Sequence, residues 1–128
     1  ETPAAPADSD LVQQLATLSS QADKGKTAFD ALYPTAADHV HAAAGAAVSS
    51  EAWVVAHVDL SALEQARYDS VYALASLDTL YAERAKALAE GKVQGGVTEI
   101  LAARKAALAV VDAQNDRVDQ LRAALTTP

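Results

Sequence analysis

The stretch "SEAWVVAHVDLSALEQARYDSVYALASLDTLYAERAKALAEG", residues 50–91, has no glycine or proline between its first and last residues. Ser49 or Ser50 is a good N-cap, Glu51 places a negative charge in the first turn, and Gly91 suits the position just after a helix. Two rows of residues recur every seven positions along it: Trp53, Leu60, Arg67, Leu74, Tyr81 and Leu88, and Ala56, Leu63, Ser70, Leu77 and Arg84. This spacing is typical of a helix that packs along its whole length, and it predicts a continuous helix over residues 52–90.

The chain before this stretch predicts a second helix, which starts after Asp8 or Ser9 and continues to about residue 47. Its apolar face follows an alternating spacing of three and four residues: Leu11, Leu15, Leu18, Ala22, Gly25, Phe29, Leu32 and Ala36. Pro34 disturbs the pattern, because proline lacks a backbone donor and clashes with the preceding turn. We therefore expect a kink or a break at residues 33–35.

The chain after Gly91 predicts a third helix, over residues 97–125. Its apolar face consists of Val97, Ile100, Ala107, Val111, Val118, Leu121 and Leu125. Alanine, the strongest helix former, supplies 32 of the 128 residues, and no stretch alternates convincingly like a β-strand. Three helical segments joined by short turns predict an all-α fold, an antiparallel three-helix bundle with long helices. A sharp break at Pro34 would divide the same chain into four helices.

The length of the chain is that of one ordinary domain. We expect a helical-bundle domain over residues 9–126, preceded by a flexible segment over residues 1–8. This segment is small, proline- and alanine-rich and without lysine or arginine, as sequences that follow a signal-peptide cleavage site often are. No apolar run approaches membrane-spanning length. The sequence therefore predicts an exported protein, in the bacterial periplasm or outside the cell.

The composition also limits the chemistry. The net charge of −7 disfavours nucleic acid and anionic lipid as partners and leaves basic partners open. The chain has no cysteine, so it forms no disulfide and offers no thiolate. No phosphate-binding loop, dinucleotide motif or catalytic triad order is visible. We expect a non-catalytic interaction or scaffold module without a cofactor, with another protein as its partner and a homo-oligomer as an open alternative.

The three histidines suggest a first alternative, a metal site. If residues 47–50 form the turn of an antiparallel hairpin, His41 lies opposite His57, and Asp38 shares the face of His41. Two imidazoles and a carboxylate are ligands that Zn²⁺ or Cu²⁺ accepts. Asp59 follows His57 by two residues and points elsewhere, so the group falls one ligand short. The more favoured interpretation is that the histidines are structural or surface residues, with His39 facing solvent.

Polar residues at core positions suggest a second alternative. Hairpin pairing brings Arg67 near Asp30 and Asp119, and Ser70 near Asp116, so a polar layer is predicted to cross the middle of the bundle. A layer of this kind often fixes the register of helices. This structural interpretation is favoured over a ligand site.

The ligand site would use the same layer. Arg67 would hold an anion, with Asn115 beside it and with Tyr68 and Tyr72 as a lining. Hairpin pairing also places Gly25 opposite Tyr72. A glycine at that position would leave room for the aromatic ring.

Overall fold

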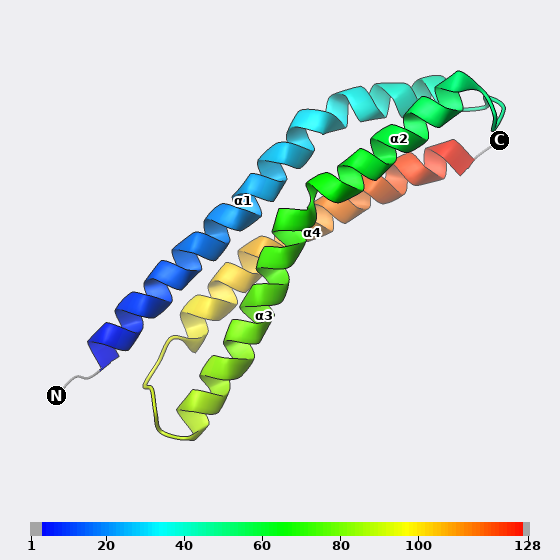
Figure 1. The fold of residues 1–128 in the computed structure, drawn as a ribbon. Coiled ribbons are helices and arrows are strands. Elements are labelled where there is room, and N and C mark those ends of the chain that lie inside the picture. The colour runs from blue at the N-terminus through cyan, green and yellow to red at the C-terminus, as the bar shows by residue number, and fades with distance from the viewer. Residues whose placement is uncertain (1–3, 127–128) are drawn as a thin grey trace.

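The computed structural model describes residues 4–126, and within them every regular element is a helix. In chain order the helices are α1 (Ala4–Ala43), α2 (Glu51–Ala66), α3 (Tyr68–Ala89) and α4 (Val97–Thr126). α2 and α3 run back along α1, and α4 returns beside them (Figure 1). The predicted all-α helical bundle is therefore confirmed. No helix within residues 4–126 is both long and apolar enough to cross a membrane.

α1 begins earlier than predicted, and it stays one helix at Pro34, where a kink or a break was predicted. It begins at Ala4, upstream of the predicted cap, since a proline in the first turn of a helix lacks only a donor that has no partner there. Residues 1–3 of the predicted flexible segment lie outside the described residues. The helix also continues through Pro34, so the predicted break is wrong. Figure 1 shows a bend in the cyan part of α1, which is the milder of the two predicted outcomes.

The predicted continuous helix over 52–90 is interrupted at one residue. Arg67 ends α2 and begins α3, with φ −81° and ψ 0°. Its N–H still donates to the carbonyl of Leu63 at 3.3 Å, and its own carbonyl accepts from Val71 at 3.0 Å. The interruption falls one turn before Ser70, which is bonded to α1. α2 and α3 therefore follow different parts of the bent α1.

The core has two parts, one at each side of this interruption. The first joins α1, α2 and α4 and contains Phe29, Ala36, Ala37, Val40, Ala43, Ala56, Leu60, Leu63, Val118, Leu121 and Leu125. The second joins α1, α3 and α4 and contains Ala22, Ala73, Leu77 and Ala107. Three of the four residues of the second part are alanines, and Leu15, Leu18, Leu74 and Ala103 pack against it.

Candidate functional site

A polar layer separates the two parts of the core, where α1 crosses α3. Gly25 is buried, and a Cβ at this position would lie 2.5 Å from the backbone nitrogen of Ser70. Only glycine permits backbones to approach so closely. The fully buried Ser70 donates its hydroxyl proton to the carbonyl of Ala22 at 2.9 Å. The side-chain amide of Gln114 donates to the hydroxyl of Ser70 at 3.2 Å and points to the carbonyl of Gly25 at 3.4 Å, so the layer ties together α1, α3 and α4.

This layer lies at the predicted level but uses other partners. Ser70 contacts Gln114 rather than Asp116, and it also takes the place opposite Gly25 that was assigned to Tyr72. Tyr72 is instead 50% exposed. The Ser70 pairing with α4 was extrapolated across the α3–α4 connection over residues 90–96, and the Gly25 pairing was extrapolated from the turn near residue 50 past the interruption at Arg67. The spacing of apolar residues reveals neither the path of the connection nor the interruption.

Arg67 contacts neither of the carboxylates predicted for the polar layer, Asp30 and Asp119, but it does contact Asn115, which was predicted to lie beside it in the ligand site. Its guanidinium donates to the side-chain carbonyl of Asn115, which lies one turn before the expected Asp119. Asp30 is bonded to Lys26 at 2.8 Å and to Arg117 at 3.1 Å. The hydrogen bond from Lys26, followed by the charges of Lys26 and Arg117, holds the pKa of Asp30 below its ordinary value, although partial burial opposes this. Arg67 is therefore paired with a neutral amide and not with a carboxylate.

This pairing lowers the expected cost of removing Arg67. An Arg67→Ala variant should lose about 1–2 kcal/mol of unfolding free energy, because one charged hydrogen bond and the packing of the stem disappear without stranding a buried carboxylate. An Arg67→Met variant keeps the stem and removes the buried Nε, which has no hydrogen-bond partner, so it should lose less than about 1 kcal/mol. Urea unfolding of both variants measures the difference. Equal losses of about 3 kcal/mol or more would mean that Arg67 has a buried ionic partner.

The four residues of the predicted ligand site come together only in pairs. Arg67 meets Asn115, while the rings of Tyr68 and Tyr72 stack with centroids 6.0 Å apart. Arg67 and Tyr68 line a groove of about 660 Å³ on the outer side of α2 and α3, which Glu64 also lines. Tyr72 lines a different groove, between α1 and α3. The tyrosine pair therefore lies between two grooves and does not close over Arg67.

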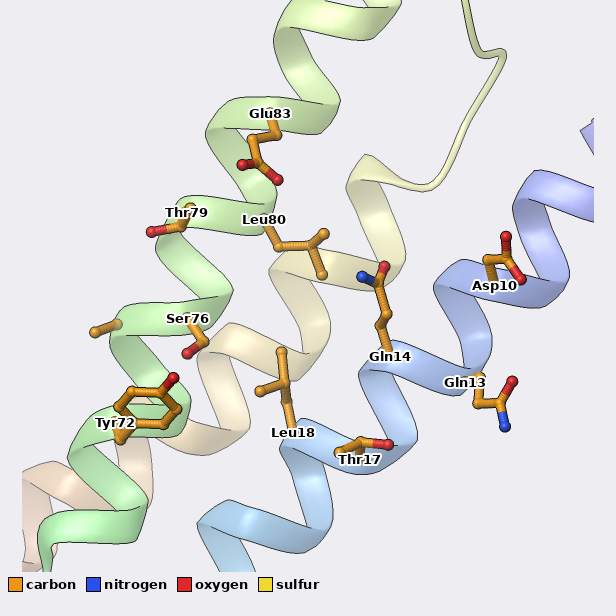
Figure 2. A pocket seen from close by; sticks show the side chains of 11 residues that line it. Asp10, Gln13, Gln14, Thr17, Leu18, Tyr72, Ser76, Thr79, Leu80 and Glu83 are labelled. Carbon is orange, nitrogen blue, oxygen red and sulfur yellow. The ribbon is translucent and has the colours of Figure 1, made fainter.

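The groove between α1 and α3 has a volume of about 1050 Å³. It opens because α1 and α3 separate from their crossing at Gly25 toward the N-terminus of α1 (Figure 1). The lining residues are Asp10, Gln13, Gln14, Thr17 and Leu18 from α1, and Tyr72, Ala75, Ser76, Thr79, Leu80 and Glu83 from α3. Figure 2 shows Leu18 and Leu80 projecting into the space between the two helices, with Tyr72 toward the crossing. Glu83 and Asp10 lie toward the opposite, wide end.

The charges of this groove are confined to its wide end. Apart from Asp10 and Glu83, its described lining consists of amides, hydroxyls, an alanine, two leucines and a tyrosine, and no lysine or arginine is among them. Within the part of the chain that the structure describes, neither carboxylate belongs to an ion pair. The sequence carried a signal for this surface, since residues 11–22 and 70–77 have no charged side chain. We did not predict the groove, because each run alone also fits an ordinary helix.

The histidines are arranged differently from the predicted metal site. His39, not His41, pairs across the hairpin, through a contact between its Nδ1 and the carboxylate of Asp59. The ring of His57 stacks on Trp53 with centroids 3.6 Å apart, and its Nδ1 lies 3.2 Å from the carbonyl of Trp53. His41 is exposed, and the side chain of His39, which was predicted to face solvent, is 44% exposed while it contacts Asp59. The buried face of α1 at Val40 leaves residue 39 beside α2 and turns residue 41 outward.

No contact supports a metal at the predicted set of His41, His57 and Asp38. Among residues 4–126, no three histidine, cysteine, aspartate or glutamate side chains lie close enough together to hold a metal ion. No family model, curated protein or solved structure matches the chain.

Proposed function

We propose that the chain is a non-catalytic interaction module that binds a helical segment of another protein in the groove between α1 and α3. The observation that carries this proposal is the groove itself, whose walls are uncharged except at the wide end, which has two leucines along its length and is closed at one end by the Gly25 crossing. Laying a helix into a groove between two helices is a recurrent mode of protein recognition. A helix docked there would complete a four-helix arrangement around α1, α3 and α4.

The dimensions of the groove fit a short helix. The lining of α3 runs from Tyr72 to Glu83, roughly 17 Å at about 1.5 Å per residue, which corresponds to three helical turns. Leu18 and Leu80 offer apolar contact, and the amides and hydroxyls around them offer hydrogen bonds to a partly polar helix. The exposed ring of Tyr72 would lose contact with water on docking. Tyrosine is enriched among the residues that contribute most to binding energy.

The proposed function also includes the cellular location of the module. The excess of acidic residues favours solubility. We place the module outside the cytoplasm, in the bacterial periplasm or the extracellular space, where its partner would be another envelope or secreted protein.

Site-specific photo-crosslinking in the organism that encodes the chain tests this proposal. A photoreactive amino acid at Thr79, which is exposed and lines the groove, should form an adduct with another protein. The same amino acid at Ala109, which is exposed and does not line the groove, serves as the matched control. An Ala75→Trp change, which fills the groove, should remove the adduct at Thr79 without changing the helical circular dichroism.

Mass spectrometry of the adduct then identifies the segment that was bound. The proposal requires this segment to be helical and to come from another protein. An adduct that forms equally well from Ala109, or that survives Ala75→Trp, would contradict docking in the groove. An adduct with a second copy of the chain would replace the proposed partner with a homo-oligomer.

A further inference from the structure

We infer that the helix bound in the groove between α1 and α3 is basic at one end, and that this end lies between Asp10 and Glu83. The inference rests on the proposed function, because it specifies the chemistry of the docked segment. Its lysine or arginine side chains would occupy the wide end of the groove. Its uncharged turns would pass Leu18 and Leu80 and end near Tyr72.

The distribution of charge along the groove carries this inference. Both charged residues of the described lining are carboxylates, they come from opposite walls, and both lie at the wide end (Figure 2). Neither is neutralised by an ion pair within the described residues. Coulomb attraction between a cation and such groups grows when a docked helix excludes water around them. The groove is therefore complementary to a segment with one cationic end.

The same charges select against other segments. A helix with an acidic end would bring like charges together at Asp10 and Glu83, which is a repulsive element of specificity. A helix that is basic along its whole length would leave cations against the uncharged walls, away from any carboxylate of the groove. The net charge of −7 attracts any cationic peptide. The test therefore has to separate attraction by Asp10 and Glu83 from attraction by the net charge of the whole chain.

Three synthetic peptides provide the probes. Each has 18 residues and the same alanine, leucine and glutamine helix, and they differ only in a terminal pair of lysines, glutamines or glutamates. Binding to the intact chain is measured by fluorescence anisotropy at low salt. The lysine peptide should bind about tenfold more tightly than the glutamate peptide, with the glutamine peptide between them, and added salt should reduce the difference.

Two double variants with equal changes in net charge show whether the preference for the lysine peptide arises in the groove. Asp10→Asn with Glu83→Gln removes both carboxylates of the groove, and it should bring the three peptides to within about twofold of one another. Asp112→Asn with Asp116→Asn changes the net charge equally at exposed positions of α4 outside the groove, and it should leave the preference intact. A preference for lysine that survives the groove variant, or that both variants reduce equally, would overturn the inference.

The outcomes also distinguish this inference from the proposed function. Equal binding of the three peptides that is lost in Ala75→Trp would contradict the basic end and retain helix docking. If none of the three peptides binds and Thr79 forms no crosslink, both the basic end and helix docking in the groove would be contradicted. A crosslinked natural segment without lysine or arginine in its terminal turn would overturn the inference alone.

Discussion

A Phe29→Ala variant should lose about 3–5 kcal/mol of unfolding free energy, the largest effect that we expect from a single truncation. Phe29 is fully buried and belongs to the core cluster that joins α1, α2 and α4. Its ring also stacks against Tyr33 with centroids 6.1 Å apart. Since small domains are stable by about 5–15 kcal/mol, urea unfolding should show a much earlier transition.

Leu32→Ala is the control for this prediction, because it lies one turn from Phe29 on the same helix. Leu32 is 44% exposed, so its truncation should cost less than about 1 kcal/mol. A loss for Leu32→Ala equal to that for Phe29→Ala would mean that α1 presents a different face to the core.

Leu32 also illustrates how far the sequence determines the buried faces. The heptad spacing predicted Leu32 as a core residue, whereas Tyr33 takes that place against the core. The deviation is local, because the buried face steps by four residues from Phe29 to Tyr33 where the predicted spacing steps by three, and Ala36 of the same predicted face is buried again. In α4 the predicted apolar face is accurate except at Val97, which is only partly buried. The buried residues of that face are Ile100, Ala107, Val111, Val118, Leu121 and Leu125.

The relation between helices was harder to predict than the helices themselves. Capping residues and glycines located the turns near residue 50 and residue 91 because these signals are local. The interruption at Arg67 and the choice of Asn115 as its partner depend on contacts between segments distant in the chain. The groove depends on the same contacts, because it exists only where two helices diverge. Sequence spacing therefore predicted a polar layer and its level, while its partners required the structure.

Gly25→Ala is the second variant with a large expected effect, a net loss of about 2 kcal/mol of unfolding free energy. Alanine favours a helix by about 1 kcal/mol over glycine, so an ordinary exposed site would become more stable. Here the new Cβ would lie 2.5 Å from the backbone nitrogen of Ser70, and a backbone cannot move aside as a flexible side chain can. Overpacking of this kind costs about 1–3 kcal/mol and sometimes more, and it would also weaken the bonds that Ser70 and Gln114 make to α1.

Gly95→Ala controls for the change of residue type, because a Cβ at Gly95 would meet no atom within 4 Å. It should alter the unfolding free energy by less than about 0.5 kcal/mol. The two glycine variants also test how the fold produces the groove, since α1 and α3 diverge from the crossing at Gly25. Forcing the crossing apart should weaken binding of the lysine peptide by about tenfold, while Gly95→Ala should not affect it. A Gly25→Ala protein with unchanged stability and unchanged peptide binding would show that the two backbones are not in contact and that the crossing does not shape the groove.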